Sequence, residues 1–303
     1  MACYRPLPAW RTAGGDITFD RRHGDTELTL PCGACVGCRL DRARSWSLRC
    51  VHEASLHKLN CFLTLTYSDH QVPPGGSLRY RDFQLFMKRL RKEAKVPIRF
   101  FVCGEYGEQL SRPHYHACLF GYDFPDKKPV SYLSSTPSWR SKVLERLWPL
   151  GFSHLGSLNA RSAAYAARYV LKKVTGVASD RHYRRVDADG VVHQLVPEFA
   201  RMSLRPGLGA IWYRKYSGDV HTHDYVVADG RKFGVPKYYD RLLERSDPDR
   251  LSALKEEREL RSLPFRPEGT PERLQVREVV ETARIKTMQR KFEDDPLGGV
   301  RSR

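Results

Sequence analysis

The chain has 303 residues, and its 52 Lys and Arg exceed its 35 Asp and Glu, which gives a formal net charge of +17 at pH 7. This balance favours a polyanionic partner, because binding releases the partner's counterions, and nucleic acid is the obvious candidate. The sequence has no run of about 18 apolar residues and no signal-like apolar stretch near its start, so we expect a soluble protein that is neither exported nor bound to a membrane.

Residues 1–44 are rich in Gly and Arg, lack clear periodicity, and are predicted to form an N-terminal Cys-rich segment. In CGACVGC, Cys32, Cys35 and Cys38 have the two-residue gaps of thiolate knuckles that bind zinc. A fourth ligand would have to come from elsewhere in the chain, and the candidates are Cys50, Cys3 and His23. Two interpretations stay open: a structural Zn²⁺ site, with Cys50 as one candidate ligand, or reduced thiols packed beneath the first strand of the core.

The next segment is predicted to fold in the order β-α-β-β-α-β, which is the ferredoxin-like α+β arrangement with an antiparallel sheet. Runs of β-branched and aromatic residues, or apolar residues at helical spacing, define the six elements. These are a strand at 60–67, a helix at 81–95, strands at 98–105 and 114–122, a helix at 139–148 and a strand at 152–158. A further helix at about 160–174 is appended, and we place a nuclease domain at 45–178.

Two accessory regions are predicted beyond this domain. Residues 179–245 contain Asp-Gly turns at 189–190 and 229–230 between β-rich runs, which indicates hairpins. Residues 246–303 are charged and helical in character, and the last dozen residues have the composition of a disordered tail. On the helix at 81–95, the basic side chains either follow a DNA backbone or form an ordinary solvated face; they are Lys88, Arg89, Arg91 and Lys92.

The sequence PHYHACLFG contains a candidate metal site. On a strand, His114 and His116 point to the same side, about 7 Å apart, so they can grip one divalent ion. Glu105, on the neighbouring predicted strand, can supply an oxygen ligand. His-x-His pairs also occur by chance, and His221 and His223 form a second pair in this chain.

The helix at 160–174 separates an Ala-rich face from a polar face that carries Tyr165 and Tyr169 about 6 Å apart, followed by Lys172 and Lys173. A phenol with a pKa near 10 needs electrostatic help to attack a phosphodiester, which the two ammonium groups or a metal ion can give. The alternative is that the tyrosines merely border a basic DNA-binding helix. Candidate DNA-binding residues in and around these segments are Arg161, Arg168, Thr64, Thr66 and Arg112.

The segments FLTLTY, GEYGEQLSRPHYHACLFG and YAARYVLKK, in this order, resemble the three motifs of HUH replication initiators, most closely those of gokushovirus-type phages with small single-stranded DNA genomes. The likeness extends over most of residues 30–245, and the tyrosine follows the His motif, unlike the order usual in relaxases. The resemblance implies an HUH fold in which His114, His116 and Glu105 bind Mg²⁺ or Mn²⁺. It also implies that Tyr165 and Tyr169 are paired nucleophiles and that His221 and His223 are surface residues.

The resemblance further implies an endonuclease that nicks single-stranded or melted origin DNA, keeps a 5′-phosphotyrosine link and religates to end rolling-circle replication. Host helicase and DNA polymerase would be its partners in the bacterial cytoplasm. Two alternatives remain open: a transposase or relaxase built from the same parts, and a non-catalytic origin-binding protein.

Overall fold

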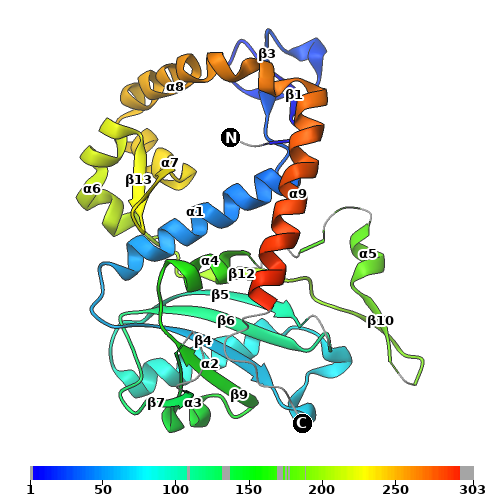
Figure 1. Ribbon diagram of the computed structural model, residues 1–303, viewed down its shortest axis with the longest axis vertical. Helices are drawn as coiled ribbons and strands as arrows, with labels where there is room; N and C mark the ends of the chain where they lie inside the picture. Colours follow the sequence, from blue (N-terminus) through cyan, green and yellow to red (C-terminus); the bar gives the residue numbers. More distant parts are fainter. Residues whose placement is uncertain are drawn as a thin grey trace. The chain divides into compact units, whose positions relative to one another are not determined.

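The computed structural model describes residues 3–107, 110–131, 137–168, 173–174, 176, 178–187 and 189–293. The chain divides into two compact units (Figure 1). One unit combines residues 1–42 with 252–294, and the other combines residues 43–251 with 295–303. The unit boundaries fall inside helices α1 (Val36–Ala54) and α8 (Pro248–Ser262).

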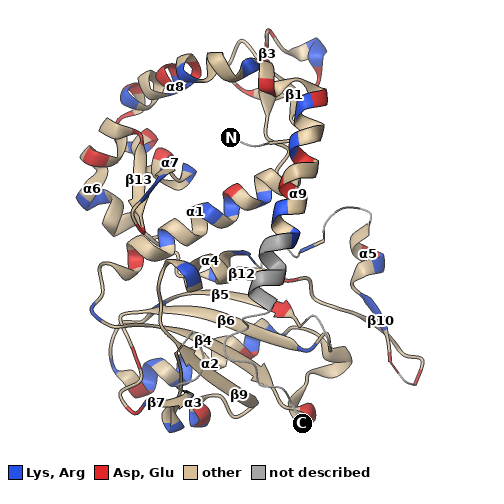
Figure 2. Cartoon of the chain, viewed as in Figure 1, with Lys and Arg blue, Asp and Glu red and all other residues tan. Residues whose placement is uncertain are grey.

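The first unit contains a three-stranded antiparallel sheet that the sequence analysis did not predict. Its strands are β1 (Leu7–Arg11), β2 (Ile17–Thr18) and β3 (Thr26–Leu30), in the order β2-β1-β3. The unit also contains the start of α1 and helix α9 (Pro271–Glu293), and Figure 2 shows basic residues spaced along α1. Regular structure therefore begins well before residue 45.

The second unit is built on a seven-stranded sheet whose neighbouring strands all pair antiparallel, in the order β12-β5-β6-β4-β9-β8-β7. The predicted α+β class with an antiparallel central sheet is confirmed. The four longest strands occupy the predicted positions: β4 (Asn60–Tyr67), β5 (Arg99–Tyr106), β6 (Pro113–Phe120) and β9 (Gly151–Gly156). The three shorter strands are β7 (Lys128–Ser131), β8 (Ser138–Arg140) and β12 (Phe199–Met202).

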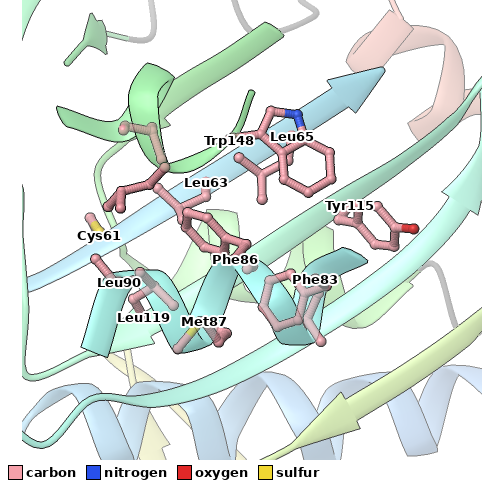
Figure 3. Close-up of a cluster of buried hydrophobic side chains, with 14 of the residues drawn as sticks. Cys61, Leu63, Leu65, Phe83, Phe86, Met87, Leu90, Tyr115, Leu119 and Trp148 are labelled. Atoms are coloured by element: carbon pink, nitrogen blue, oxygen red, sulfur yellow. The ribbon is translucent and has the colours of Figure 1, made fainter. Parts of the chain in front are cut away.

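The two faces of this sheet carry different helices. Helices α2 (Tyr80–Ala94) and α3 (Lys142–Leu147) pack on one face around Phe83, Phe86 and Trp148 (Figure 3). The prediction of one helix over 139–148 was wrong at its start, because Trp139 and Arg140 lie in β8. The second half of α1 and helix α4 (Ala160–Arg168) pack on the opposite face.

The remaining elements of the second unit include both predicted Asp-Gly hairpins. The first is β10 (Arg184–Val186) with β11 (Val192–Gln194), and the second is β13 (Tyr225–Ala228) with β14 (Arg231–Gly234). The other helices are α5 (Ala178–His182), α6 (Ala210–His223) and α7 (Lys237–Ser246). Short 3₁₀ turns over the whole chain are Arg21–His23, Asp69–Gln71, Pro74–Gly76 and Leu263–Gly269.

Two expectations about the distal chain are settled differently by these helices. His221 is not a surface residue: it lies on α6, is 4% exposed, and packs its ring 5.5 Å from that of Tyr213. His223 is exposed, as predicted. Residues 294–303 of the predicted disordered tail lie outside the described residues. Within the described part of the chain, no helix is both long and apolar enough to cross a membrane.

Candidate active site

Strand pairing places the candidate metal ligands on one face of the sheet. Side chains alternate along β6, so His114 and His116 face the side of the sheet that carries α4. Tyr115 between them points into the opposite core (Figure 3), where its hydroxyl is 2.8 Å from that of Tyr67. In register, Glu105 on β5 lies directly opposite His114. The predicted two-His, one-carboxylate group is therefore assembled from two adjacent strands.

The three ligand side chains converge closely. Glu105 Oε1 lies 2.5 Å from His114 Nε2 and 3.0 Å from His116 Nε2. The Glu105 and His116 side chains are 2% and 3% exposed, whereas that of His114 is 15% exposed. Burial alone would raise the pKa of Glu105, but hydrogen bonds from the two imidazoles lower it to about 2. The carboxylate is thus held as an anion, which suits a cation ligand.

The rest of each imidazole ring is fixed by a second contact. His114 Nδ1 lies 3.1 Å from the backbone oxygen of Arg112, and His116 Nδ1 lies 3.0 Å from Thr64 Oγ1. A proton on Nδ1 of each ring satisfies these contacts and leaves Nε2 available to a metal ion. The donor set of two nitrogens and one carboxylate oxygen, all within 4.8 Å of one another, fits a divalent ion.

Helix α4 brings one predicted tyrosine to this group. Ala163, Ala166 and Ala167 are at most 1% exposed, so the helix lies close to the sheet, as its Ala-rich face predicted. The Tyr165 ring centre is 5.0 Å from that of His116, with the rings 78° apart. Tyr169 and Lys172 lie outside the described residues, and Lys173 is exposed beyond the described end of the helix.

The candidate DNA-binding residues have different surroundings. Arg161 is exposed on α4, and Arg168 is half-buried at the described end of the same helix. Thr66 lies opposite His114 across the β4–β6 pair, on the face of the metal group, whereas Thr64 contacts His116 directly. Arg112 donates to the backbone oxygen of Tyr67 at 3.0 Å and pairs with Asp69, so it braces the strand ends.

The cysteine cluster is completed by a different residue from the one first favoured. The sulfur atoms of Cys3, Cys32, Cys35 and Cys38 lie within 4.8 Å of one another. Cys50 does not join them, because twelve residues along α1 correspond to a rise of about 18 Å, and it is buried in the core on the sheet. His23 is exposed and pairs with Asp20.

The thiols of this cluster differ in their electrostatics. Burial tends to raise the pKa of Cys35, but the backbone N–H groups of Cys38 and Tyr4 outweigh it and bring the pKa to about 7. All eight cysteines are free thiols in the structure. No disulfide therefore competes with metal binding at the cluster.

Comparison with known proteins connects these sites to a family. The family model for the replication-associated protein ORF2 matches residues 60–174, which include the His motif and α4. Replication-associated protein VP4 of Bdellovibrio phage phiMH2K is 32% identical over 265 residues, covering 82% of this chain and 79% of the relative.

Two further relatives carry similar descriptions. Replication-associated protein ORF2 of Spiroplasma virus 4 is 33% identical over 288 residues, covering 86% of each chain. Replication-associated protein ORF4 of Chlamydia phage 1 is 26% identical over 225 residues, covering 71% of this chain and 54% of the relative. No solved structure matches the chain.

Proposed function

Because this chain belongs to the family of microvirus-type replication initiators, we propose that it nicks and religates the replication origin of a small circular single-stranded DNA phage genome. The observation that carries the proposal is the position of Tyr165: its ring lies against His116, whose Nε2 faces Glu105 together with that of His114. A nucleophile and a candidate phosphate-binding cation site thus share one face of the sheet. We assign the nuclease function to residues 45–178.

Glu105, His114 and His116 would hold the divalent ion. A bound Mg²⁺ or Mn²⁺ would supply Lewis acidity, withdrawing charge from the scissile phosphate and orienting it for in-line attack. Glu105 brings a negative charge that increases cation affinity, and the contacts of Arg112 and Thr64 aim the two imidazoles. Neutral nitrogen and anionic oxygen donors together are compatible with either ion.

In the proposed reaction, the Tyr165 oxygen attacks phosphorus after the phenol loses its proton. A phosphorus–oxygen bond to the tyrosine forms, the bond to the 3′-oxygen breaks, and that oxygen takes up a proton to become a free 3′-hydroxyl. The DNA 5′ end stays attached to the enzyme as a phosphotyrosine. Because this linkage is a phosphodiester like the one cleaved, attack by a 3′-hydroxyl reverses the step and reseals DNA without ATP.

Tyr169 is proposed as a second nucleophile that cuts the regenerated origin while Tyr165 holds the first end, or the reverse. Lys172 and Lys173 are proposed to stabilise phosphate charge in the transition state. The free 3′-hydroxyl would prime a host polymerase, with a host helicase separating the strands in the bacterial cytoplasm. Arg161, Arg168 and Thr66 are proposed to hold the single-stranded or melted origin.

The direct test is the covalent intermediate. Wild-type protein, incubated with its cognate circular genome and Mn²⁺, should give a protein-linked 5′ end that survives a denaturing gel. The double variant Tyr165→Phe, Tyr169→Phe should bind the same DNA but form no adduct, whereas Tyr216→Phe on α6 should form it normally. An adduct that persists in the double variant would remove both tyrosines from the nucleophile role.

The metal assignment has a separate test. His114→Ala should lose both nicking and high-affinity Mn²⁺ binding, measured by electron paramagnetic resonance, because the site keeps only two ligands. His223→Ala, at the exposed member of the second His pair, should change neither. Nicking by wild-type protein without divalent metal would contradict the assignment, and strand transfer without replication would favour a transposase or relaxase instead.

A further inference from the structure

The four clustered cysteines of the first unit have the dimensions of a tetrahedral thiolate site. We propose that Cys3, Cys32, Cys35 and Cys38 bind one structural Zn²⁺, with Cys3 as the fourth ligand. Four sulfurs, each about 2.3 Å from a tetrahedral zinc ion, are about 3.8 Å apart. The Cys35 and Cys3 sulfurs are already 4.0 Å apart, and all four lie within 4.8 Å of one another. Only small side-chain adjustments are needed to close the site.

Backbone amides are already aimed at the sulfurs. The N–H of Cys32 donates to the sulfur of Cys3 at 3.3 Å, and that of Cys35 donates to the sulfur of Cys32 at 3.2 Å. The sulfur of Cys35 accepts from the N–H groups of Tyr4 and Cys38, at 3.4 and 3.5 Å. These bonds stabilise negative charge on sulfur, which is the state that ligates a metal.

The place of the cluster in its unit gives the ion a task. Among the described residues of this unit, the buried apolar side chains besides Cys35 and Cys38 are few: Tyr4, Ala9, Leu254 and Leu274. Units with so small a core usually need a metal or another cross-link. Tyr4 and Leu274 pack directly with the cysteines. A zinc ion would therefore fasten the start of the chain to the first turn of α1 and to α9.

Zinc content and cobalt spectra of the full-length chain test this assignment. The double variant His114→Ala, His116→Ala is used as background, so that metal at the other site does not contribute. This protein should retain one zinc per chain after passage over a chelating resin. Replacement by Co²⁺ should produce thiolate-to-cobalt charge-transfer and d–d bands typical of four sulfur ligands.

Two cysteine variants in that background identify the fourth ligand. Cys3→Ser should release metal to a chelator at least about tenfold faster and shift the cobalt bands toward three sulfurs. Cys50→Ala, at a buried thiol outside the cluster, should keep both properties, with folding monitored by circular dichroism. Absence of retained zinc, or a Cys3→Ser spectrum identical to that of the background protein, would overturn the proposal.

An independent observation concerns an aromatic ring on the metal face of the large sheet. Phe152 lies in β9, between β4 and β8, yet it is 60% exposed. In register it pairs with Thr66, which pairs on its other side with His114. Residues paired across adjacent strands share a face, so the Phe152 ring and the His114 imidazole flank Thr66 on the same surface.

We infer that Phe152 stacks on a base of the single-stranded DNA substrate, an inference that rests on the proposed function. An exposed aromatic ring on a sheet offers a flat apolar surface to an unpaired base, and such stacking tolerates any sequence. The ring is continuous with the candidate site through Thr66, so a strand that places a phosphate near His114 can place a neighbouring base over Phe152. The α2 face of the sheet is closed by its own core and offers no such surface.

Anisotropy with a fluorescent single-stranded origin oligonucleotide tests the stacking in the non-cleaving Tyr165→Phe, Tyr169→Phe protein. Phe152→Ala should weaken affinity by about tenfold, and Phe152→Trp should restore it. Phe265→Ala is the control, because this phenylalanine of the other unit is 70% exposed. Unchanged affinity in Phe152→Ala, with normal adduct formation by wild type, would refute the stacking alone. Failure of wild type to form an adduct would refute the proposed function itself.

Discussion

Thr64 connects β4 to the histidine pair through its hydroxyl, which lies 3.0 Å from His116 Nδ1. Removing the hydroxyl in Thr64→Val preserves the β-branched shape but releases the ring orientation. We expect a loss of about 10- to 100-fold in Mn²⁺ affinity, the usual effect of removing such a partner, measured by titration calorimetry. Thr64→Ser should retain near-normal affinity. Equal affinity in Thr64→Val and wild type would mean that strand pairing alone orients His116.

His52 on α1 makes the stability of the second unit depend on pH. Its ring stacks 3.6 Å from that of Trp212, and its Nδ1 lies 2.8 Å from the Tyr239 hydroxyl. Burial lowers the pKa of His52 from its ordinary value of 6.5 to about 4. The unfolded chain therefore binds a proton that the folded chain refuses, and the contribution to stability present above pH 6.5 is lost as pH falls toward 4.

At pH 5 this protonation should cost about 2 kcal/mol relative to pH 7. Differential scanning calorimetry should show a drop in melting temperature between these pH values that is smaller in His52→Gln than in wild type. His70→Gln, at an exposed histidine, should keep the wild-type pH dependence. An identical slope in His52→Gln and wild type would show that His52 is protonated in the folded state.

The candidate ligands were predictable from sequence because they depend on local rules. Strand alternation places His114 and His116 on one side, and the short connection between β5 and β6 brings Glu105 opposite His114. The contact of Thr64 with His116 was not predicted as such, because it depends on the pairing of β4 with β6, strands separated by α2 and β5. Cys3 was only one of three candidates, since nothing local in the sequence ties residue 3 to residue 32.

Among the helices and strands, those with strong periodicity were predicted and those held by distant partners were missed. Helix α2 buries Phe83, Phe86 and Leu90 at helical spacing, so its pattern is explicit. Strand β12 is only four residues long and exists because it pairs with β5, which is far away in the sequence. Helix α1 carries arginines among small and cysteine side chains, which conceals its buried positions.

Close packing of α4 is the feature that sets the position of Tyr165. Ala166 is 0% exposed against the sheet, so Ala166→Leu would overpack this contact and push the helix outward, at a cost of about 1–3 kcal/mol. We expect adduct formation to fall much more than DNA affinity, because Tyr165 moves away from His116. Ala164→Leu, at a half-buried position on the same helix, is the matched control. Equal adduct yields in the two variants would mean that α4 is not constrained by this packing.

The net charge of +17 is distributed unequally in its uses. On α2, Arg89 donates to the Leu147 backbone oxygen at 2.9 Å and Arg91 to that of Ile98 at 3.0 Å. These two arginines therefore have structural partners, which favours the solvated-face interpretation of α2 over a DNA-tracking one. Arg161 lies instead on α4, the helix that carries Tyr165 on the opposite face of the sheet.

Salt dependence of binding separates the cations that touch DNA from those that only add charge. Each phosphate contact contributes about 0.7 to the slope of log affinity against log salt concentration for a single strand. In the non-cleaving tyrosine double variant, Arg161→Gln should therefore reduce the slope by about 0.7. Lys88→Gln, on the exposed surface of α2, should lower affinity slightly at low salt and leave the slope unchanged. A slope reduced equally by both substitutions would mean that the strand also crosses α2, and the proposed path over β9 and α4 would then be wrong.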